Sequence, residues 1–366
     1  MIDFRYHLVS IVAVFLALAI GIVLGTTALN GPLQTSLRNL EARLRSEANS
    51  LRAQNGQLTQ QVGADQAFAQ GAASVLLPHQ LDGQSVVLVI APGAEQQVIS
   101  GVSTVVDRAG GTVTGQVVLQ QQFFDTSATN ENSLTALAQQ VTPPGFPGAG
   151  QNAQQAAYPQ LTGQFEAASL LAAAIVTKDG PALPGAQSHA ILAGFAQDGF
   201  LQVSTPTLAP ATLAVVIIPA TPPTASDSNP ANVALISMTQ QLNAASRGAV
   251  LAGSYPGSGA GSAIDELASG NTGIEVSSVD NANYETGQVM VVQALSGLLA
   301  GQKPGSYGIA PDAAPSPVPT SSASLSPASS STRPAARHSA AAGPREKPGH
   351  SPAPRRSATA SPGASR

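Results

Sequence analysis

The first 62 residues constrain this chain more than any other part of it. No side chain between Leu8 and Leu29 is charged, and an apolar helix of about 20 residues is long enough to cross the hydrocarbon core of a bilayer. A seven-residue apolar repeat, typical of coiled coils, comes next. It consists of Leu37, Leu44, Leu51 and Leu58. The sequence therefore predicts a short N-terminal segment (1–7), a transmembrane helix in contact with membrane lipid (8–29) and a coiled coil (33–62).

Two interpretations of the apolar run compete. A secretory signal peptide has a shorter apolar region, about 7–15 residues, behind a positively charged segment. Here the preceding positive charge is limited to Arg5, His7 and the amino terminus, against Asp3. We therefore expect an uncleaved single-pass anchor. Cleavage near Thr26-Thr27-Ala28 is the alternative.

The leucine repeat is regular for two heptads and weaker afterwards. With the seven-spaced leucines at heptad position a, Leu33 and Leu40 occupy position d, and a dry two-stranded seam needs apolar side chains at both positions. The later d positions are Glu47, Gln54 and Gln61. We expect a parallel stalk that joins copies of the chain into a homo-oligomer. The alternative is an amphipathic helix that folds back on its own domain.

Strands and helices alternate through residues 64–308. The run Ser85–Ile90 is short, apolar and rich in β-branched residues, as in a strand covered on both faces. A helix with valines at helical spacing follows it. Further strands are predicted over 112–119, 213–218, 249–252 and 275–279, helices over 165–176, 233–245, 263–268 and 286–299, and a long loop over 142–158. Because strand–helix–strand units build parallel sheets, we predict a three-layer α/β domain with a mostly parallel sheet.

Charge divides the chain unevenly. Residues 64–310 carry four basic side chains against 15 acidic ones, whereas 311–366 carry seven basic against two acidic. An acidic body argues against nucleic acid as a partner, because nucleic-acid binding needs a basic face. The segment 310–366 is rich in Pro, Ser, Ala and Arg and has no aromatic residue. It cannot bury enough apolar surface to offset chain entropy, so we predict a disordered tail.

Two loops follow predicted strands, at the edge where open α/β sheets bind ligands. Ala91-Pro92-Gly93-Ala94 has no dinucleotide fingerprint. The glycine-rich loop 253–261 lacks the Lys-Ser/Thr pair of a phosphate-binding loop, and Ser262 stands where the G-x-G-x-x-G pattern needs glycine. We expect a flexible connector and no bound cofactor. The chain has no cysteine and no G-x-S-x-G elbow, so no catalytic residue is assigned and an enzyme is not expected.

Residues with copper-ligand chemistry are scattered along the sequence. His79 and His189 are the only histidines of the body, and Met238 and Met290 are single methionines on apolar helical faces, which core packing explains. Copper(I) prefers soft sulfur ligands, and copper(II) prefers clustered imidazoles. Since no pair of these residues has ligand spacing, the location of any metal site is unknown from sequence.

Three stretches together resemble one actinobacterial family, the copper transport protein B family first named in mycobacteria. The first is the opening segment 1–10, which runs into the Gly21–Gly25 end of the apolar helix. The second runs from Val86 to Gln122-Phe123-Phe124-Asp125. The third comprises Ser278-Val279-Asp280-Asn281, Gly287-Gln288 and Gly305-Ser306-Tyr307-Gly308. The resemblance covers about residues 1–308.

This resemblance implies an envelope protein that limits intracellular copper, with mycobacterial relatives described as channel-forming proteins of the outer membrane. Copper would be the transported ion. The resemblance also implies a body outside the cytoplasmic membrane, whereas Arg38, Arg43 and Arg45 favour the cytoplasmic side by the positive-inside rule. One apolar helix cannot enclose a channel, so a pore would require associated anchors. The alternative function is a membrane-anchored coiled-coil scaffold that holds an envelope partner and transports nothing.

Overall fold

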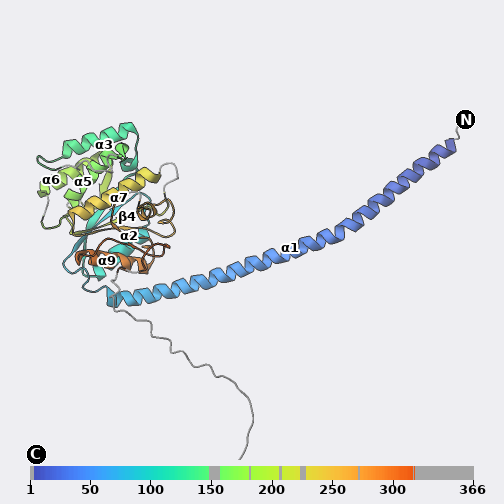
Figure 1. Cartoon of the computed structure of the whole chain (residues 1–366), viewed down its shortest axis with the longest axis horizontal. Helices are drawn as coiled ribbons and strands as arrows, with labels where there is room; N and C mark the ends of the chain where they lie inside the picture. Colours follow the sequence, from blue (N-terminus) through green and yellow to red (C-terminus); the bar gives the residue numbers. More distant parts are fainter. Residues whose placement is uncertain are drawn as a thin grey trace, which may run out of the picture. The chain divides into compact units, whose positions relative to one another are not determined.

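The computed structural model describes residues 4–147, 157–180, 183–205, 208–222, 228–270, 273–315 and 317. Its first element is α1 (Phe4–Leu76), a single helix of 73 residues that is drawn in blue in Figure 1. At 1.5 Å per residue this helix is about 110 Å long. The predicted segments 8–29 and 33–62 therefore belong to one continuous helix, which runs on into the body.

The body is built on one sheet. Its strands are β1 (Ser85–Ile90), β2 (Thr112–Leu119), β3 (Leu201–Val203), β4 (Leu213–Ile217), β5 (Ala249–Ala252), β6 (Ser277–Val279) and β7 (Ser306–Tyr307). The spatial order is β3-β2-β1-β4-β5-β6-β7. Every neighbouring pair is parallel except β2 with β3. The predicted α/β class with a mostly parallel sheet is confirmed.

Helices cover both faces of this sheet. They are α2 (Gln96–Arg108), α3 (Ala128–Val141), α5 (Thr162–Ile175), α6 (Gly185–Gln197), α7 (Ser228–Ala245), α8 (Ala263–Ala268) and α9 (Glu285–Leu299), with the 3-10 turns η1 (Gln121–Phe124) and η2 (Pro159–Leu161). Successive strand side chains point to opposite faces. Val87 and Val89 join the core under α3, α5, α6 and α7, whereas Val86 and Leu88 join the core under α2, α9 and the end of α1. Figure 1 shows these two helical layers with β4 between them.

Four elements were absent from the sequence prediction, namely α3, α6, β3 and β7. The helix α3 is rich in Asn, Thr and Gln and has a weak apolar stripe. The strands β3 and β7 have only three and two residues, and they exist through pairing with β2 and β6. Of the long loop predicted over 142–158, residues 142–147 form neither helix nor strand, and 148–156 lie outside the described residues.

The body extends past the boundary expected at residue 308. Ala314 pairs with Tyr307 in an isolated parallel bridge, and the backbone N–H groups of Ile309 and Ala310 bind the Asp280 carboxylate. Residues 309–314 therefore belong to the fold. The rest of the predicted tail, over 318–366, lies outside the described residues.

Candidate functional site

A crevice lies beyond the carboxyl ends of β1 and β4, where the strand order reverses. Ligands of open α/β sheets bind at such a reversal point. A small cavity of about 110 Å³ there is lined by Ala91, Pro92, Gln121, Phe124, Pro219, Ala231 and Leu235. A wider hollow of about 500 Å³ shares Gln121 and Phe124 and is rimmed by Gln122, Asp125, Thr126 and Pro230. The crevice therefore has apolar walls and a polar rim.

The Gln122–Asp125 segment at this rim is held in place by amide side chains. The Asn130 amide donates to the carbonyls of Gln122 and Asp125, at 2.9 and 2.7 Å. The Gln164 amide donates to the carbonyl of Phe123 at 3.3 Å. The Asp125 carboxylate itself accepts from the N–H and hydroxyl of Ser127 at the start of α3. These hydrogen bonds fix the position of the Gln122–Asp125 segment, which therefore supports the rim of the crevice.

Behind the rim, a partly buried carboxyl group lies between α3 and α5. Glu131 Oε1 accepts from the N–H of Gly163 at 2.6 Å. Glu131 Oε2 and Gln164 Oε1 are buried and have no hydrogen-bond partner among the described residues. Desolvation raises the pKa of Glu131 above its usual value. The bond from Gly163 opposes this rise, the neighbouring Glu166 carboxylate adds to it, and the Gln164 side chain opposes it. Glu131 therefore holds its proton to a higher pH than an exposed glutamate does.

The glycine-rich loop 253–261 is held by contacts with residues of neighbouring loops. Ser254 Oγ donates to Glu95 Oε2 at 2.6 Å, and Asn283 holds both the N–H and the carbonyl of Tyr255 at 2.9 Å. A side chain at Gly257 would collide with the backbone carbonyl of Ala220. Close packing therefore explains glycine at that position, and these contacts hold in place a loop that was expected to be a flexible connector.

The buried Asp280 joins the two halves of the third stretch that carried the family resemblance. It follows β6, and its carboxylate accepts from the N–H groups of Ile309 and Ala310, the shortest distance being 2.7 Å. Gly308 has a φ of +138°, and a Cβ at that residue would overlap the Asp280 carboxylate. Asp280 and Gly308 therefore form a clamp for the end of the body.

The residues with copper-ligand chemistry do not come together. Met238 of α7 is buried on one face of the sheet, and Met290 of α9 is half-buried on the other face. His79 is exposed and bonded to Asp82 at 2.7 Å, and His189 is exposed on α6. Within the described ranges, no group of three or more His, Cys, Asp or Glu side chains could hold a metal ion.

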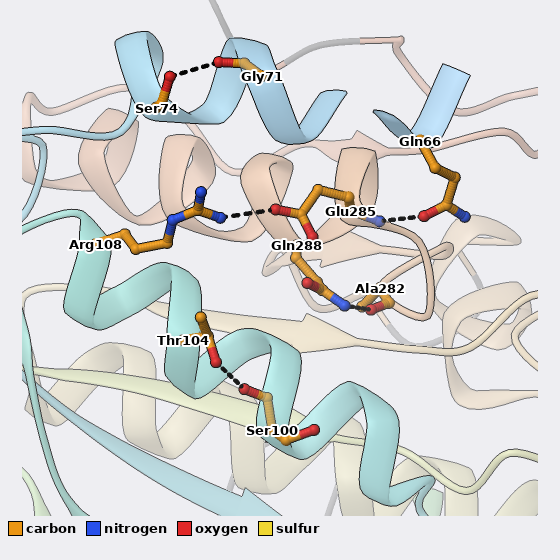
Figure 2. A network of polar contacts seen from close by, with 9 residues as sticks. All are labelled: Gln66, Gly71, Ser74, Ser100, Thr104, Arg108, Ala282, Glu285 and Gln288. Atoms are coloured by element: carbon orange, nitrogen blue, oxygen red, sulfur yellow. Dashed lines mark hydrogen bonds and ion pairs between the residues drawn. The ribbon is translucent and has the colours of Figure 1, made fainter. Parts of the chain in front are cut away.

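The end of α1 is attached to α9 and α2. Ala69 and Ala73 of α1 and Leu77, which directly follows the helix, are buried, and Ala73 and Leu77 belong to the core under α2 and α9. Figure 2 shows Gln66 turned toward the first residue of α9, where its Oε1 accepts from the N–H of Glu285 at 3.4 Å. The Glu285 carboxylate pairs with Arg108 at the end of α2, at 3.0 Å. We name these contacts the α1–α9 junction.

The remainder of α1 exposes apolar side chains. Its segment Phe4–Gly25, with a mean hydropathy of 2.9, is the one described helix segment long and apolar enough to cross a membrane, and none of it is buried. It begins four residues before the predicted span. The heptad leucines from Leu37 to Leu58 are more than half exposed.

A comparison with known proteins covers both the long helix and the body. The model of a family described as copper transport outer membrane protein, MctB, matches residues 1–318, from the start of α1 to beyond the Asp280 clamp. The chain belongs to the MctB family. The copper transporter MctB of Mycobacterium leprae (strain TN) is 31% identical over 328 residues, covering 87% of this chain and 100% of the relative. The copper transporters MctB of Mycobacterium tuberculosis (strain H37Rv) and Mycobacterium bovis are each 29% identical over 312 residues, covering 84% of this chain and 96% of the relative.

Membership in the MctB family confirms the resemblance predicted from the sequence. The family is named for copper transport and not for a catalysed reaction. Sequence reasoning missed the α1–α9 junction, because an ion pair between Arg108 and Glu285 joins residues 177 positions apart. The local sequence signal for this junction is the pair Ala69 and Ala73, because small residues four apart permit close helix packing.

Proposed function

We propose that this chain is a membrane-anchored protein of the cell envelope that takes part in copper homeostasis and limits intracellular copper. The match of the MctB family model to residues 1–318 carries the proposal. Its mycobacterial relatives are named copper transporters, and the exposed segment Phe4–Gly25 has the length and apolarity of an anchor.

In this proposal the body lies outside the cytoplasmic membrane and copies associate through residues 33–62. The outer-membrane name of the family supports the location. The exposed leucines of α1 support the association, because such a stripe gains burial only when another helix covers it. One apolar segment per chain cannot surround an ion, so conduction of copper would require several anchors.

Deletion of the protein tests the proposal. Cells lacking it should tolerate less copper and retain more of it, and the full-length chain should restore both, whereas a chain lacking residues 1–30 should restore neither. Zinc tolerance is the control and should not change. Unaltered copper tolerance and copper content after deletion would refute the role in copper homeostasis.

A second candidate, a scaffold that organises envelope partners without conducting copper, is favoured by the crevice at the carboxyl ends of β1 and β4. Conductance separates the two candidates. Full-length protein in a planar bilayer should pass copper ions if copies form a pore. A silent bilayer, together with a stable envelope partner recovered on the tagged full-length chain, would favour the scaffold.

A further inference from the structure

The body occupies one face of α1 and leaves another face open. Ala69 is 7% exposed, and Ala73 and Leu77 are fully buried. These residues lie four apart and therefore on one face of the helix. Gln66, three residues before Ala69, belongs to the same face and bonds Glu285. At about 100° per residue, the contacts of the α1–α9 junction therefore span about 80°, or less than a quarter of the helix circumference.

Two large apolar side chains lie on the other side of the same turns. Phe68 is 78% exposed and Val75 is 81% exposed, the highest values among the large apolar side chains between Leu37 and Leu76. At about 100° per residue they lie about 140–160° around the helix from Ala73. The body therefore does not cover them.

Phe68 and Val75 are in phase with the leucine stripe. They follow Leu40 by four and five heptads, and so they occupy heptad position d of the register that places Leu37, Leu44, Leu51 and Leu58 at position a. The next a positions are Asp65 and Ala72. Large apolar side chains therefore return beside the body at position d, whereas position a carries none after Leu58.

We propose that residues 65–75 of α1 are a self-association surface, on which a second copy of this chain packs its own residues 65–75 in parallel. The inference rests on the stalk association of the proposed function and extends it beyond residue 62, down to the base of the body. Phe68 and Val75 are its anchoring side chains.

Three observations point to a second copy as the occupant. The surface continues the heptad register of the leucine stripe. Knobs-into-holes packing requires a partner helix with the same period and phase, and a second copy of α1 has both. Anchors in one membrane would hold two copies parallel and at high effective concentration. The α1–α9 junction occupies heptad positions b, e and f, so the body leaves positions a and d of residues 65–75 free for a second helix.

Because the chain has no cysteine, single cysteines can test this surface in the full-length protein in native membranes. The variants are Phe68→Cys and Val75→Cys, with Gln70→Cys as an exposed control at position f and Leu51→Cys as a reporter of the leucine stripe. A short bis-maleimide should cross-link the variants at 51, 68 and 75 into dimers at least five-fold more than the variant at 70.

Each other result overturns the proposal in a different way. Cross-linking at 51 without cross-linking at 68 and 75 would mean that pairing stops before the body, and the stalk association would survive. Absence of cross-linking at all three positions would refute the stalk association as well. Equal cross-linking at 70 would show random collision. Copper tolerance of the same strains reports the proposed function separately.

Discussion

At the scale of single residues, Asp280 connects the end of the body to the sheet. Replacement by alanine removes the acceptor of the Ile309 and Ala310 N–H groups, and hydrogen bonds to charged groups contribute about 1.5–3 kcal/mol to stability. We expect Asp280→Ala to lower the free energy of unfolding by about 2 kcal/mol and to speed hydrogen exchange over 306–314. Urea unfolding of the detergent-solubilised chain and exchange mass spectrometry measure both effects.

The matched control is Asp198→Ala, because Asp198 is exposed at the end of α6. It should leave the unfolding midpoint and the exchange of 306–314 unchanged. If Asp280→Ala behaves like this control, the carboxylate does not hold the segment.

A single residue, Glu131, makes the folding stability of the protein depend on pH. Burial raises its pKa in the folded protein, so the folded state holds a proton that the unfolded state releases near pH 4.5. By linkage, stability is greatest below the unfolded value and falls as pH rises through the folded pKa. We expect Glu131→Gln to remove this fall and to gain stability at pH 7. Unfolding midpoints measured from pH 4 to pH 8 check it. A gain that is equal at every pH would contradict the protonation argument.

The hydrogen-bond partners of individual residues in the candidate site were the hardest feature to predict from the sequence. The segments around Asp125 and Asp280 were identified by resemblance, but their bonding depends on residues such as Asn130 and Ile309, whose proximity is set by the fold. The methionines were predicted as core residues, and Met238 lies in the core. Local apolar spacing was sufficient for that prediction because it is a property of the helix alone.

At the scale of elements, the α1–α9 junction joins the long helix to the body. Ala73 is fully buried in it, and adding bulk to a packed site costs about 1–3 kcal/mol. We expect Ala73→Leu to loosen residues 66–77 and to increase protease cleavage there, while the sheet stays folded. The control Gln70→Leu adds the same side chain on an exposed face and should not change cleavage. Equal cleavage in both variants would mean that the junction does not depend on close packing.

Elements that depend on local pattern were predicted well, and elements that depend on distant pairing were not. The bounds of β1, β2, β5 and α8 match the sequence prediction, because their apolar runs and flanking turns are local signals. In contrast, β7 exists only through its pairing with β6 and the Asp280 clamp. The single helix α1 was split in the prediction because its composition changes from apolar to heptad-patterned along one regular backbone.

At the scale of the whole molecule, α1 is the element that joins the proposed membrane anchor to the body. The leucines at 44 and 51 are more than half exposed in α1 and lie more than a dozen residues before the junction at Gln66. Their replacement should therefore leave the body folded while it removes apolar area from the proposed seam.

In chains that carry the Phe68→Cys reporter, we expect Leu44→Gln with Leu51→Gln to abolish cross-linked dimers and to lower copper tolerance to that of the deletion strain. Glutamine keeps helix propensity close to that of leucine, so α1 should persist. The control Ala42→Gln with Ala53→Gln, in the same reporter chain, changes exposed positions f and c two residues from each leucine and should retain both dimers and tolerance. Unfolding midpoints of the body should agree in all strains. If the leucine variant loses dimers yet keeps full copper tolerance, a single copy performs the copper function and no pore of associated anchors is needed.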